Sequence, residues 1–466
     1  MPLLEMKRVQ PVTLSRPVNI AVVGAGPAGI HTADILKQQP FETRVDLFER
    51  LPVPYGLARY GVAPDHPKAA DIVSSLHDVL DRGDVRLVAG IDIGTDVSLD
   101  ALREAYDAVV LTTGASVDMP LEIPGIELNG SFGAAEFVAW YSAHPDSRQD
   151  WTLDSERIAV IGAGNVALDI TRILATDADD LLGTDIPQHV YEALRASRVT
   201  DIHVFARRGP AEAAFSPDEL RKLDEIKDVD VIVDPEDMVF TRASEYAISR
   251  FNQRKVNSET LKEWSERDPS TFTGSRRIHL HFMEAPASID GDTSVTGLTV
   301  ERTEHLVNGM VKGIGEFQQY PVGQVYRAVG YTSAPLPGIG YDHAWRRLAN
   351  TMGRVLDEEG ETIPGLYASG WIKRGPVGLI GSTKADSLQT VTQLAQDVQT
   401  LTDAGDGSDP LPKLLEQADL ESVDWEGWLR VDAAEQAHGM PDRPGRVRIF
   451  DRDQLLQIAR RQDAAE

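Results

Sequence analysis

A glycine turn near the start of the chain is the first feature that could do chemistry. Gly24, Gly26 and Gly29 follow an almost continuously apolar run at 18–23 and precede apolar residues at helical spacing. Such a turn opens a helix with free backbone N–H groups, and the missing Cβ atoms let a pyrophosphate come close. Glu49 ends the next apolar run, about 20 residues after the third glycine, where an acid can accept hydrogen bonds from ribose hydroxyls. The spacing predicts a dinucleotide site, with a simple tight turn as the alternative.

A second turn of the same kind follows an apolar run at 157–161. Ala167 stands where the third glycine would be, a substitution that the motif allows. The next apolar run, 201–206, ends in Arg207 and Arg208 rather than in an acid. Guanidinium groups bind phosphate through charge and a forked geometry. The second turn is therefore predicted to bind a dinucleotide with a 2′-phosphate, NADP(H) rather than NAD(H), and a pair of exposed loop arginines is the alternative.

Two dinucleotide sites in one chain suggest a flavin in one site and a nicotinamide in the other, with a hydride passing between them. The sequence contains no cysteine. A redox-active cysteine pair, a zinc–cysteine site and a thiolate-held iron–sulfur cluster are therefore excluded within this chain, and we expect no metal site. Electrons must leave the flavin directly, for a small molecule or for a protein carrier.

The composition is that of an ordinary globular protein, with 42% hydrophobic and 26% charged residues. At roughly 150 residues per domain, 466 residues predict two or three domains. The 46 Lys and Arg against 73 Asp and Glu give a net charge of −27, which argues against a nucleic-acid or anionic-membrane binder. The first 17 residues have no apolar core of a signal peptide, and no apolar run comes near the about 18 residues of a membrane helix. We expect no membrane insertion and a cytoplasmic location.

Parallel strands are needed to position these turns. The predicted strands that flank them are 18–23, 45–48, 157–161 and 201–206. Three further apolar strands run into a glycine, as strands do at the crossings between domains of two-dinucleotide flavoproteins; they are 109–115, 325–331 and 366–371. We therefore place domain boundaries near residues 116 and 340, and a linker at 403–412.

The segment 51–67, LPVPYGLARYGVAPDHP, is far more specific than either glycine turn. It resembles the signature of the adrenodoxin reductase-like ferredoxin–NADP⁺ reductases. The resemblance covers nearly the whole chain and includes 160–170, 206–223, 370–387 and the C-terminal residues Trp425, Trp428 and Asp432.

This resemblance implies an α/β fold with two Rossmann-like domains, as in the glutathione-reductase-like two-domain flavoproteins. The NADP-binding domain, 116–339, would be inserted into a discontinuous FAD-binding domain, 1–115 and 340–466. The implied activity is hydride transfer from NADPH to FAD, followed by single-electron transfer to an iron–sulfur ferredoxin. Nothing in the family pattern demands an oligomer, so we expect a monomer.

The family's cofactor contacts carry over to matching positions of this sequence. The implied FAD contacts, besides the first turn, are Ala28, Glu49, Leu57, Trp371, Gly378, Leu379 and Ile380. The implied NADP contacts are Gly164, Asn165, Val166, Ala167, Arg207, Arg208, Glu219 and Gly378.

Few residues are expected to act chemically, because hydride transfer to a flavin depends on stacking and distance more than on an acid or base. His66 and Asp169 are the candidates for catalytic support, with a purely structural role as the alternative. Lys222 departs from the family, whose members often have an acid there, and we expect it to be a solvated helix charge. Tyr55 and Tyr60 gain weight from the specific segment, whereas Trp140 and Trp151 are expected to pack in the core.

An acidic ferredoxin must dock against the repulsion of a net charge of −27, so a locally basic face is expected. The candidates are Arg195, Arg198, Arg221, Arg250, Arg254 and Lys255, with scattered solvated charges as the alternative. The main functional alternative is an NADPH-dependent reductase or diaphorase with a quinone or another small-molecule acceptor. An electron-input subunit of a larger reductase and a nucleotide-sensing regulator without turnover are further alternatives.

Overall fold

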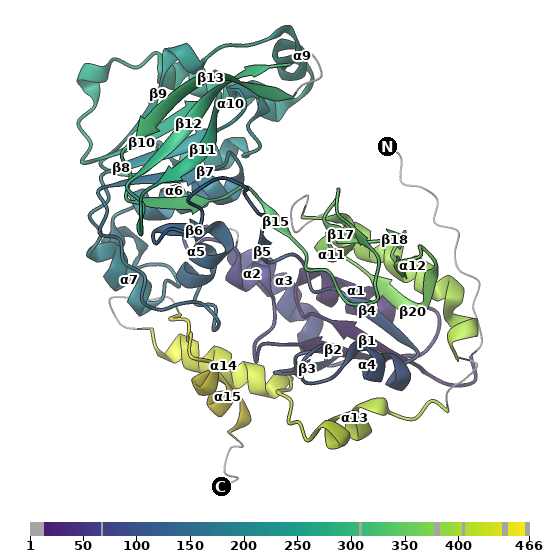
Figure 1. Cartoon of the computed structure of the whole chain (residues 1–466). Coiled ribbons are helices and arrows are strands. Elements are labelled where there is room, and N and C mark those ends of the chain that lie inside the picture. Colours follow the sequence, from purple (N-terminus) through teal and green to yellow (C-terminus); the bar gives the residue numbers. More distant parts are fainter. Residues whose placement is uncertain are drawn as a thin grey trace.

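Two large sheets, one in each of two lobes, form the framework of the molecule (Figure 1). The computed structural model describes residues 14–66, 69–306, 310–376, 383–402, 406–439 and 446–461. The strands of the second sheet all come from the stretch of chain between the two parts of the first sheet. The second lobe is thus inserted into the first, and the predicted α/β fold with two Rossmann-like sheets is confirmed.

The first sheet has seven strands in the order β18-β19-β20-β4-β1-β2-β3. Their bounds are β1 Val18–Val23, β2 Thr43–Glu49, β3 Arg86–Ala89, β4 Ala108–Leu111, β18 Asn350–Thr351, β19 Arg354–Leu356 and β20 Thr362–Ala368. β1 lies between β2 and β4 and is parallel to both. Every residue of β1 is buried, as expected for a central strand covered on both faces.

Helices cover both faces of this sheet. They are α1 Pro27–Lys37, α2 Leu57–Tyr60, α3 Ala69–Asp81, α4 Leu99–Ala105, α11 Trp371–Arg374, α12 Thr383–Thr402, α13 Pro410–Ala418, α14 Trp425–Ala437 and α15 Arg452–Arg460. Leu36 of α1 and Leu394 of α12 pack on one face, and Leu102 of α4 and Leu414 of α13 pack on the other. The predicted linker at 403–412 is wrong at its end, because α13 begins at Pro410 with Asp409 as its N-cap.

The second sheet has six parallel strands in the order β6-β14-β7-β8-β10-β9. Their bounds are β6 Ser131–Gly133, β7 Arg157–Ile161, β8 Asp201–Ala206, β9 Val229–Val233, β10 Arg276–Phe282 and β14 Gln324–Arg327. β7 and β8 have the bounds predicted from the sequence. Because β7 and β8 are parallel neighbours, the turns that follow them open at the same edge of the sheet.

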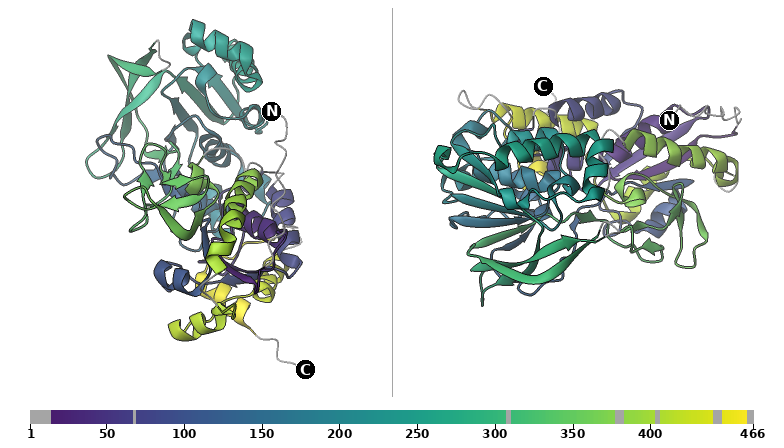
Figure 2. Two further views of the ribbon diagram at one scale, coloured as in Figure 1. Left: turned by 90° about the vertical axis from the view of Figure 1, so that its right-hand side faces the viewer. Right: turned by 90° about the horizontal axis from the view of Figure 1, so that it is seen from above.

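Different elements pack on the two faces of the second sheet. The helical segments with residues in the core on one face are α5 Ala134–Tyr141, α6 Asn165–Ala175, η1 Ala178–Leu181, α7 Gln188–Arg195, α8 Pro217–Lys222 and α10 Asn252–Ser265. The lobe also contains η2 Pro210–Glu212, η3 Pro235–Asp237, α9 Arg242–Arg250 and η4 Pro269–Thr271. An antiparallel sheet of β11 Glu284–Asp290, β12 Gly297–His305 and β13 Val311–Tyr320 packs on the other. Figure 2 shows these green strands on the opposite side of the sheet from the teal helices.

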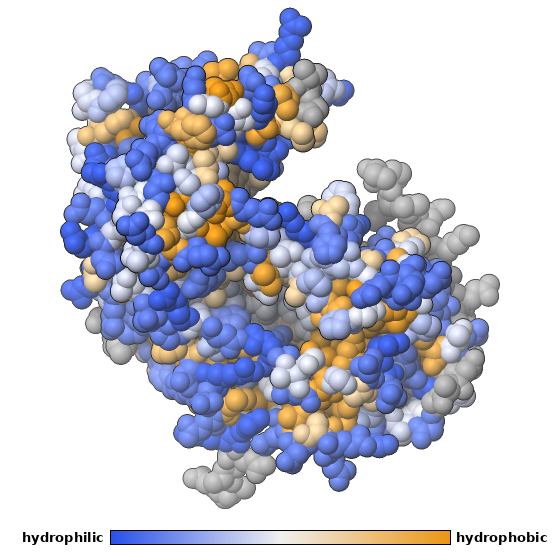
Figure 3. Space-filling view, viewed as in Figure 1, coloured by the Kyte–Doolittle hydropathy of each residue, from blue (hydrophilic) through white to orange (hydrophobic). Residues whose placement is uncertain are grey.

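Two connections cross between the lobes side by side. β5, Val117–Asp118, pairs with β15, Tyr331–Thr332, in antiparallel register. The chain then makes a short hairpin of β16, Tyr341–Asp342, and β17, Arg347–Leu348, before it re-enters the first sheet. The surface is deeply hollowed between the lobes (Figure 3).

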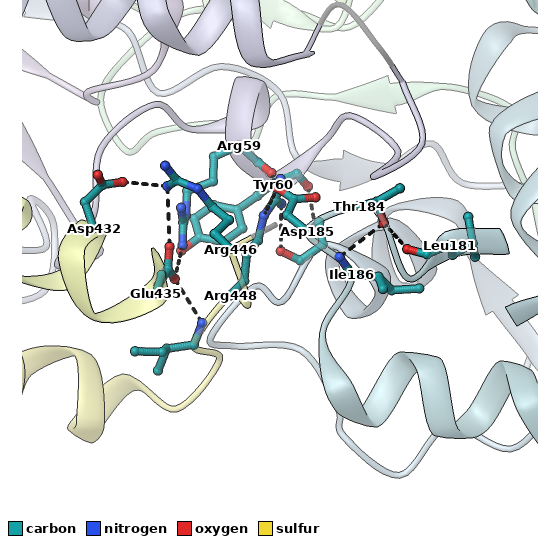
Figure 4. A network of polar contacts seen from close by, with 12 residues as sticks. Arg59, Tyr60, Leu181, Thr184, Asp185, Ile186, Asp432, Glu435, Arg446 and Arg448 are labelled. Carbon is teal, nitrogen blue, oxygen red and sulfur yellow. Dashed lines mark hydrogen bonds and ion pairs between the residues drawn. The ribbon is translucent and has the colours of Figure 1, made fainter. Parts of the chain in front are cut away.

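A buried polar network joins the C-terminal segment to both lobes (Figure 4). Arg59 of the first lobe binds Glu435 of α14 at 2.5 Å, and both side chains are almost fully buried. Arg448 forms an ion pair with Asp185 of the second lobe and donates to the carbonyl oxygens of Arg59 and Ser142. The C-terminal segment thus ties the two lobes together. No helix within the described ranges combines the length and the apolarity needed to cross a membrane.

The Arg59–Glu435 pair should contribute strongly to stability. Glu435→Gln keeps the shape of the side chain but leaves the buried guanidinium without its counter-charge, so we expect the free energy of unfolding to fall by about 2–4 kcal/mol. Urea denaturation followed by circular dichroism measures the change. Glu426→Gln, an exposed position on the same helix, is the control and should shift it by less than about 0.5 kcal/mol. Equal stability of the two variants would contradict the buried charge pair.

Candidate active site

The first glycine turn joins β1 to α1 and is fixed by backbone packing. Gly24 has a φ of +107°, a conformation that favours glycine. A Cβ on Gly29 would lie 1.9 Å from the carbonyl oxygen of Gly24, so α1 packs against the end of β1 only when position 29 is glycine. Thr112 Oγ1 lies 2.8 Å from the carbonyl oxygens of both Val23 and Gly24. These contacts hold the turn in a single conformation.

A cavity of about 430 Å³ opens beside this turn, at the carboxyl ends of β1, β2 and β4. This volume is within the roughly 300–1,000 Å³ of small-molecule and cofactor sites. The predicted first-site residues that line it are Gly24, Gly26, Ala28, Glu49, Leu57 and Trp371. Gly29 packs beneath the turn instead, and the predicted Gly378, Leu379 and Ile380 lie outside the described residues.

Glu49 is held at the cavity wall by the backbone. Its Oε2 accepts a hydrogen bond from the N–H of Ala25 at 2.9 Å, and its Oε1 accepts one from the N–H of Leu51 at 3.1 Å. Burial raises the pKa of Glu49, and these backbone N–H groups oppose that rise. Since a carboxylate has about four lone-pair sites, Glu49 keeps acceptors for hydroxyl groups of a ligand.

The residues present fit a bound dinucleotide. A Cβ on Gly26 would lie 3.8 Å from Cα of Gly56, an ordinary contact distance, so packing within the protein does not require glycine here. Gly26 is the N-cap of α1, and it carries no side chain that would cover the first N–H groups of the helix. A pyrophosphate at this position would explain the glycine.

The second turn has the same construction. Gly162 has a φ of +141°, and a Cβ there would lie 2.2 Å from the carbonyl oxygen of Ala328. Gly164 is the N-cap of α6, and a Cβ on it would meet nothing within 4 Å, so this side of the turn is open. Asn165 Oδ1 accepts a hydrogen bond from the N–H of Ser216 at 2.8 Å. Val166 is half-buried, whereas Ala167 is buried and packs in the core.

Arg207 and Arg208 follow β8 and are both exposed. Within the described residues, neither guanidinium forms an ion pair or a hydrogen bond. Their backbone is fixed, because the carbonyl of Arg207 accepts a hydrogen bond from Thr303 Oγ1 at 2.8 Å and that of Arg208 accepts one from the N–H of Met283 at 3.3 Å. Two unpaired cations on an ordered loop at the edge of the second turn suit a phosphate.

A cluster of charged side chains joins the two lobes close to both turns. At its centre is Arg172 of α6, which is 4% exposed. Arg172 binds Asp65 of the first lobe at 2.5 and 2.9 Å, Asp169 of its own helix at 2.8 Å and Glu219 of α8 at 2.9 Å. His66 Nε2 lies 3.1 Å from Oε1 of Glu219. The structure therefore brings the predicted His66, Asp169 and Glu219 into one network.

The carboxyl groups of this cluster have different pKa values. Burial alone would raise the pKa of Glu219, but the hydrogen bonds from His66 and Lys222 and the charge of Arg172 outweigh it and lower the pKa to about 2. Burial raises the pKa of Asp169 to about 6, because the charge of Arg172 offsets only part of the desolvation. At neutral pH both groups are ionised, and Asp169 takes up a proton in mildly acidic solution.

Several expectations about single residues can be checked. Lys222 is not simply a solvated charge, because its Nζ lies 2.7 Å from Oε1 of Glu219 and its side chain is 22% exposed. Tyr55 is buried against Trp428 and donates or accepts at His77, so it packs, whereas Tyr60 lines the cavity. Trp140 and Trp151 pack in the second core, as predicted.

The sequence reasoning missed Arg172 and Asp65, which hold the cluster together. The spacing of Asp169 and Arg172, three residues apart on a predicted helix, was a signal for an ion pair. No signal in the sequence connected either residue to Asp65, because that contact is between lobes.

The fold, the cavity and the second turn define an oxidoreductase with two dinucleotide-binding units. Residues 18–260 match the family described as pyridine nucleotide-disulphide oxidoreductase. The structure of FprA from Mycobacterium tuberculosis in complex with NADPH superimposes with a TM-score of 0.88 at 35% identity, covering 95% of this chain and 100% of that chain.

Curated proteins give a narrower assignment. The chain is 34% identical to the mitochondrial NADPH:adrenodoxin oxidoreductase of Arabidopsis thaliana over 467 residues, 96% of each protein. It is 37% identical to the NADPH-ferredoxin reductase FprA of Mycobacterium leprae, over 94% of this chain and 98% of that protein. The mitochondrial human NADPH:adrenodoxin oxidoreductase is 34% identical, over 96% of this chain and 93% of that protein. The chain belongs to the adrenodoxin reductase-like ferredoxin–NADP⁺ reductases, which confirms the resemblance noted in its sequence.

The raised pKa of Asp169 predicts a pH effect on stability. The folded protein binds a proton at Asp169 below about pH 6, whereas the unfolded chain does so only below about pH 4. The contribution of Asp169 to stability is therefore fully present below pH 4 and is lost as the pH rises through 6. Between pH 4 and pH 7 this loss should lower the free energy of unfolding of the wild type by about 1–3 kcal/mol. Asp169→Asn has no titrating group at this position, so it should not show the loss.

Urea denaturation midpoints at pH 4, 5, 6 and 7 measure the difference between wild type and variant. Asp218→Asn, an exposed carboxylate on α8, is the control and should keep the wild-type pH profile. A wild-type profile in Asp169→Asn as well would contradict the raised pKa.

Proposed function

We propose that this protein is an NADPH:ferredoxin oxidoreductase, in which FAD takes a hydride from NADPH and passes the electrons singly to an iron–sulfur ferredoxin. The observation that carries the proposal is the presence in one chain of two glycine turns of different chemistry. The first has a cavity with an acid at its wall, and beside the second lie Arg207 and Arg208, which follow the neighbouring strand β8 and have no ion-pair partner among the described residues. The relatives named as NADPH-dependent reductases of ferredoxin or adrenodoxin support the same activity.

The first cavity is the proposed FAD site. Gly24, Gly26 and Ala28 would hold the pyrophosphate at the start of α1, and Glu49 would accept hydrogen bonds from the ribose. Leu57 and Trp371 lie on the same cavity wall. Bound flavin supplies the step between two-electron and one-electron transfer.

The second turn is the proposed NADP site. The backbone N–H groups of Gly164, Asn165, Val166 and Ala167 would hold the pyrophosphate at the start of α6, and Arg207 and Arg208 would bind the 2′-phosphate. The division that follows is an FAD-binding domain of 1–115 and 340–466 and an NADP-binding domain of 116–339. The two sheets support this division, since their strands fall entirely within these respective ranges.

His66, Asp169 and Glu219 are proposed as positioning groups between the two sites. All three belong to the charged cluster around Arg172. Among the contacts described above, this cluster connects the first lobe to α6, the helix that the second turn opens. A fixed distance between nicotinamide and flavin is what hydride transfer requires. The cluster supplies that constraint, because Arg172 binds a carboxylate from each lobe.

The proposed ferredoxin surface lies on α9 and α10. Arg250 lies over the ring of Tyr246, and Arg254 lies over the ring of Phe251, at 5.5 Å each. Both rings are more than half exposed, and neither arginine has an ion pair among the described residues. A basic and aromatic surface of this kind suits a small acidic protein.

Not all of the predicted basic residues belong to this surface. Arg195 ends α7, which lies at the opposite end of the second lobe from α9 (Figure 1). Arg198 follows the same helix and pairs with Glu156 at 2.9 Å. Arg195 and Arg198 are therefore left out of the proposed basic face, whereas the candidates on α8 and α9 lie on helices that each contact α10.

We propose a cytoplasmic monomer. The Mycobacterium leprae relative is named without an organelle, whereas the plant and human relatives are named as mitochondrial. Fractionation of the native cells and size-exclusion chromatography with light scattering test the two statements.

The arginine pair should determine the choice of nucleotide. Replacing Arg207 and Arg208 by Gln removes the two charges that face a 2′-phosphate, so we expect the KM for NADPH to rise by about 10- to 100-fold. The KM for NADH, which lacks this phosphate, should stay nearly unchanged. Steady-state reduction of ferricyanide with each nucleotide measures both values. Equal losses with the two nucleotides would mean that the pair does not recognise the 2′-phosphate.

Ferredoxin reduction should slow as salt is added, because screening weakens attraction between opposite charges. Changing Arg250 and Arg254 to Gln should raise the KM for a small acidic ferredoxin about 3- to 10-fold and flatten this salt dependence. The same changes at Arg195 and Arg198 are the matched control and should have little effect. A rate that rises or stays flat with salt, or equal effects of the two pairs, would overturn the docking surface. Saturable reduction of ferredoxin also separates this activity from a diaphorase, since any exposed reduced flavin reduces dyes.

A further inference from the structure

The arginine loop, which carries Arg207 and Arg208 after β8, is hydrogen-bonded to β12 and to Met283, the residue between β10 and β11. Thr303 of β12 donates from Oγ1 to the carbonyl of Arg207 at 2.8 Å, and its N–H donates to the carbonyl of Met283 at 2.8 Å. Met283 in turn donates its N–H to the carbonyl of Arg208 at 3.3 Å. Side chains of β12 that point the same way as Thr303 therefore lie directly behind the loop.

His305, two residues after Thr303, is one of these side chains, and it meets Glu212 there. A Cβ on Gly209, the residue that follows the two arginines, would lie 3.0 Å from Oε2 of Glu212 and 3.1 Å from Nε2 of His305. The two side chains are 13% and 11% exposed, respectively, with Oε2 and Nε2 3.5 Å apart. Oε1 of Glu212 accepts a hydrogen bond from Ser244 Oγ at 2.8 Å. The pair is thus enclosed immediately behind the loop.

A carboxylate in this place opposes phosphate binding. Like charges repel, and the repulsion is stronger near a protein than in water because the local dielectric is lower. Arg207 and Arg208 form no ion pair with Glu212, so its charge is not balanced by the residues that would face the phosphate. The basic side chain beside Glu212 is His305. Arg302, also on β12, is engaged by Asp237 at 2.6 Å.

We propose that His305 is a specificity-determining residue, whose protonated imidazole balances the charge of Glu212 behind the arginine loop and so sets how tightly the loop binds a 2′-phosphate. It is a positioning and charge-balancing residue and does not touch the nucleotide. The proposal rests on the proposed function, in which Arg207 and Arg208 recognise the 2′-phosphate. It adds a residue from the three-stranded sheet to that recognition.

Calorimetric titration of the flavin-loaded protein tests the proposal. The two probes are adenosine 2′,5′-bisphosphate and adenosine 5′-monophosphate, which differ only in the 2′-phosphate. His305→Leu should weaken binding of the bisphosphate about 3- to 10-fold and leave the monophosphate within about twofold. Glu212→Gln should tighten binding of the bisphosphate about two- to fivefold.

The double variant distinguishes charge balance from a structural role. With Glu212 neutral, His305 has no charge to balance, so the double variant should bind the bisphosphate within about twofold of Glu212→Gln. If the double variant keeps the loss seen in His305→Leu, or if His305→Leu weakens both probes equally, the proposal is overturned. Glu245→Gln, an exposed carboxylate beside Ser244, is the control and should change neither affinity.

Two further variants cover a folding failure of His305→Leu and a failure of the proposed 2′-phosphate site. If His305→Leu does not fold, His305→Gln, a polar side chain without a positive charge, takes its place. The same loss of bisphosphate affinity supports the proposal, and unchanged affinity overturns it. Arg207→Ala tests the underlying assignment. Loss of the preference for the bisphosphate in Arg207→Ala, with no effect at His305 or Glu212, overturns only the further inference. A preference that survives in Arg207→Ala overturns the assignment of the 2′-phosphate to the arginine loop.

Discussion

Arg172 makes the contact on which the placement of the two candidate sites depends. It lies on α6, the helix that the second glycine turn opens, and it binds Asp65 in the segment that follows the first site. Burying a guanidinium without partners costs several kcal/mol. Arg172 can therefore be buried only together with the carboxylates that bind it. Since the carboxylates come from both lobes, the pairing fixes the helix of one nucleotide site against the other lobe.

Other contacts between the lobes also hold the lobes in one relative position. Each lobe has its own apolar core, and Ala63 of the first lobe is buried in the core of the second. The C-terminal segment adds a second charged contact through Arg448 and Asp185. Two separate polar contacts and a paired β5–β15 connection restrict rotation of one lobe against the other. A fixed separation of the two sites is the geometry that direct hydride transfer needs.

Local patterns in the sequence predicted the parts of the site that depend on local chemistry. Gly24, Gly29 and Gly162 were predictable because their backbone conformation or packing admits no side chain. Glu49 was predictable because it ends the adjacent strand. Contacts between distant segments were not predictable. Lys222 was expected in solvent but binds Glu219, and Arg195 and Arg198 were grouped with arginines at the other end of the lobe. The pairing of His305 with Glu212 likewise depends on how β12 packs behind the loop.

The central claim is that one chain holds FAD at the first turn and NADPH at the second, close enough for direct hydride transfer. Anaerobic titration of the purified, FAD-loaded protein with NADPH and then with NADH tests it most directly. The account predicts a yellow protein whose visible flavin bands bleach at near-stoichiometric NADPH and only at much higher NADH. A protein that neither carries nor binds FAD, or whose flavin is bleached equally by the two nucleotides, would contradict it.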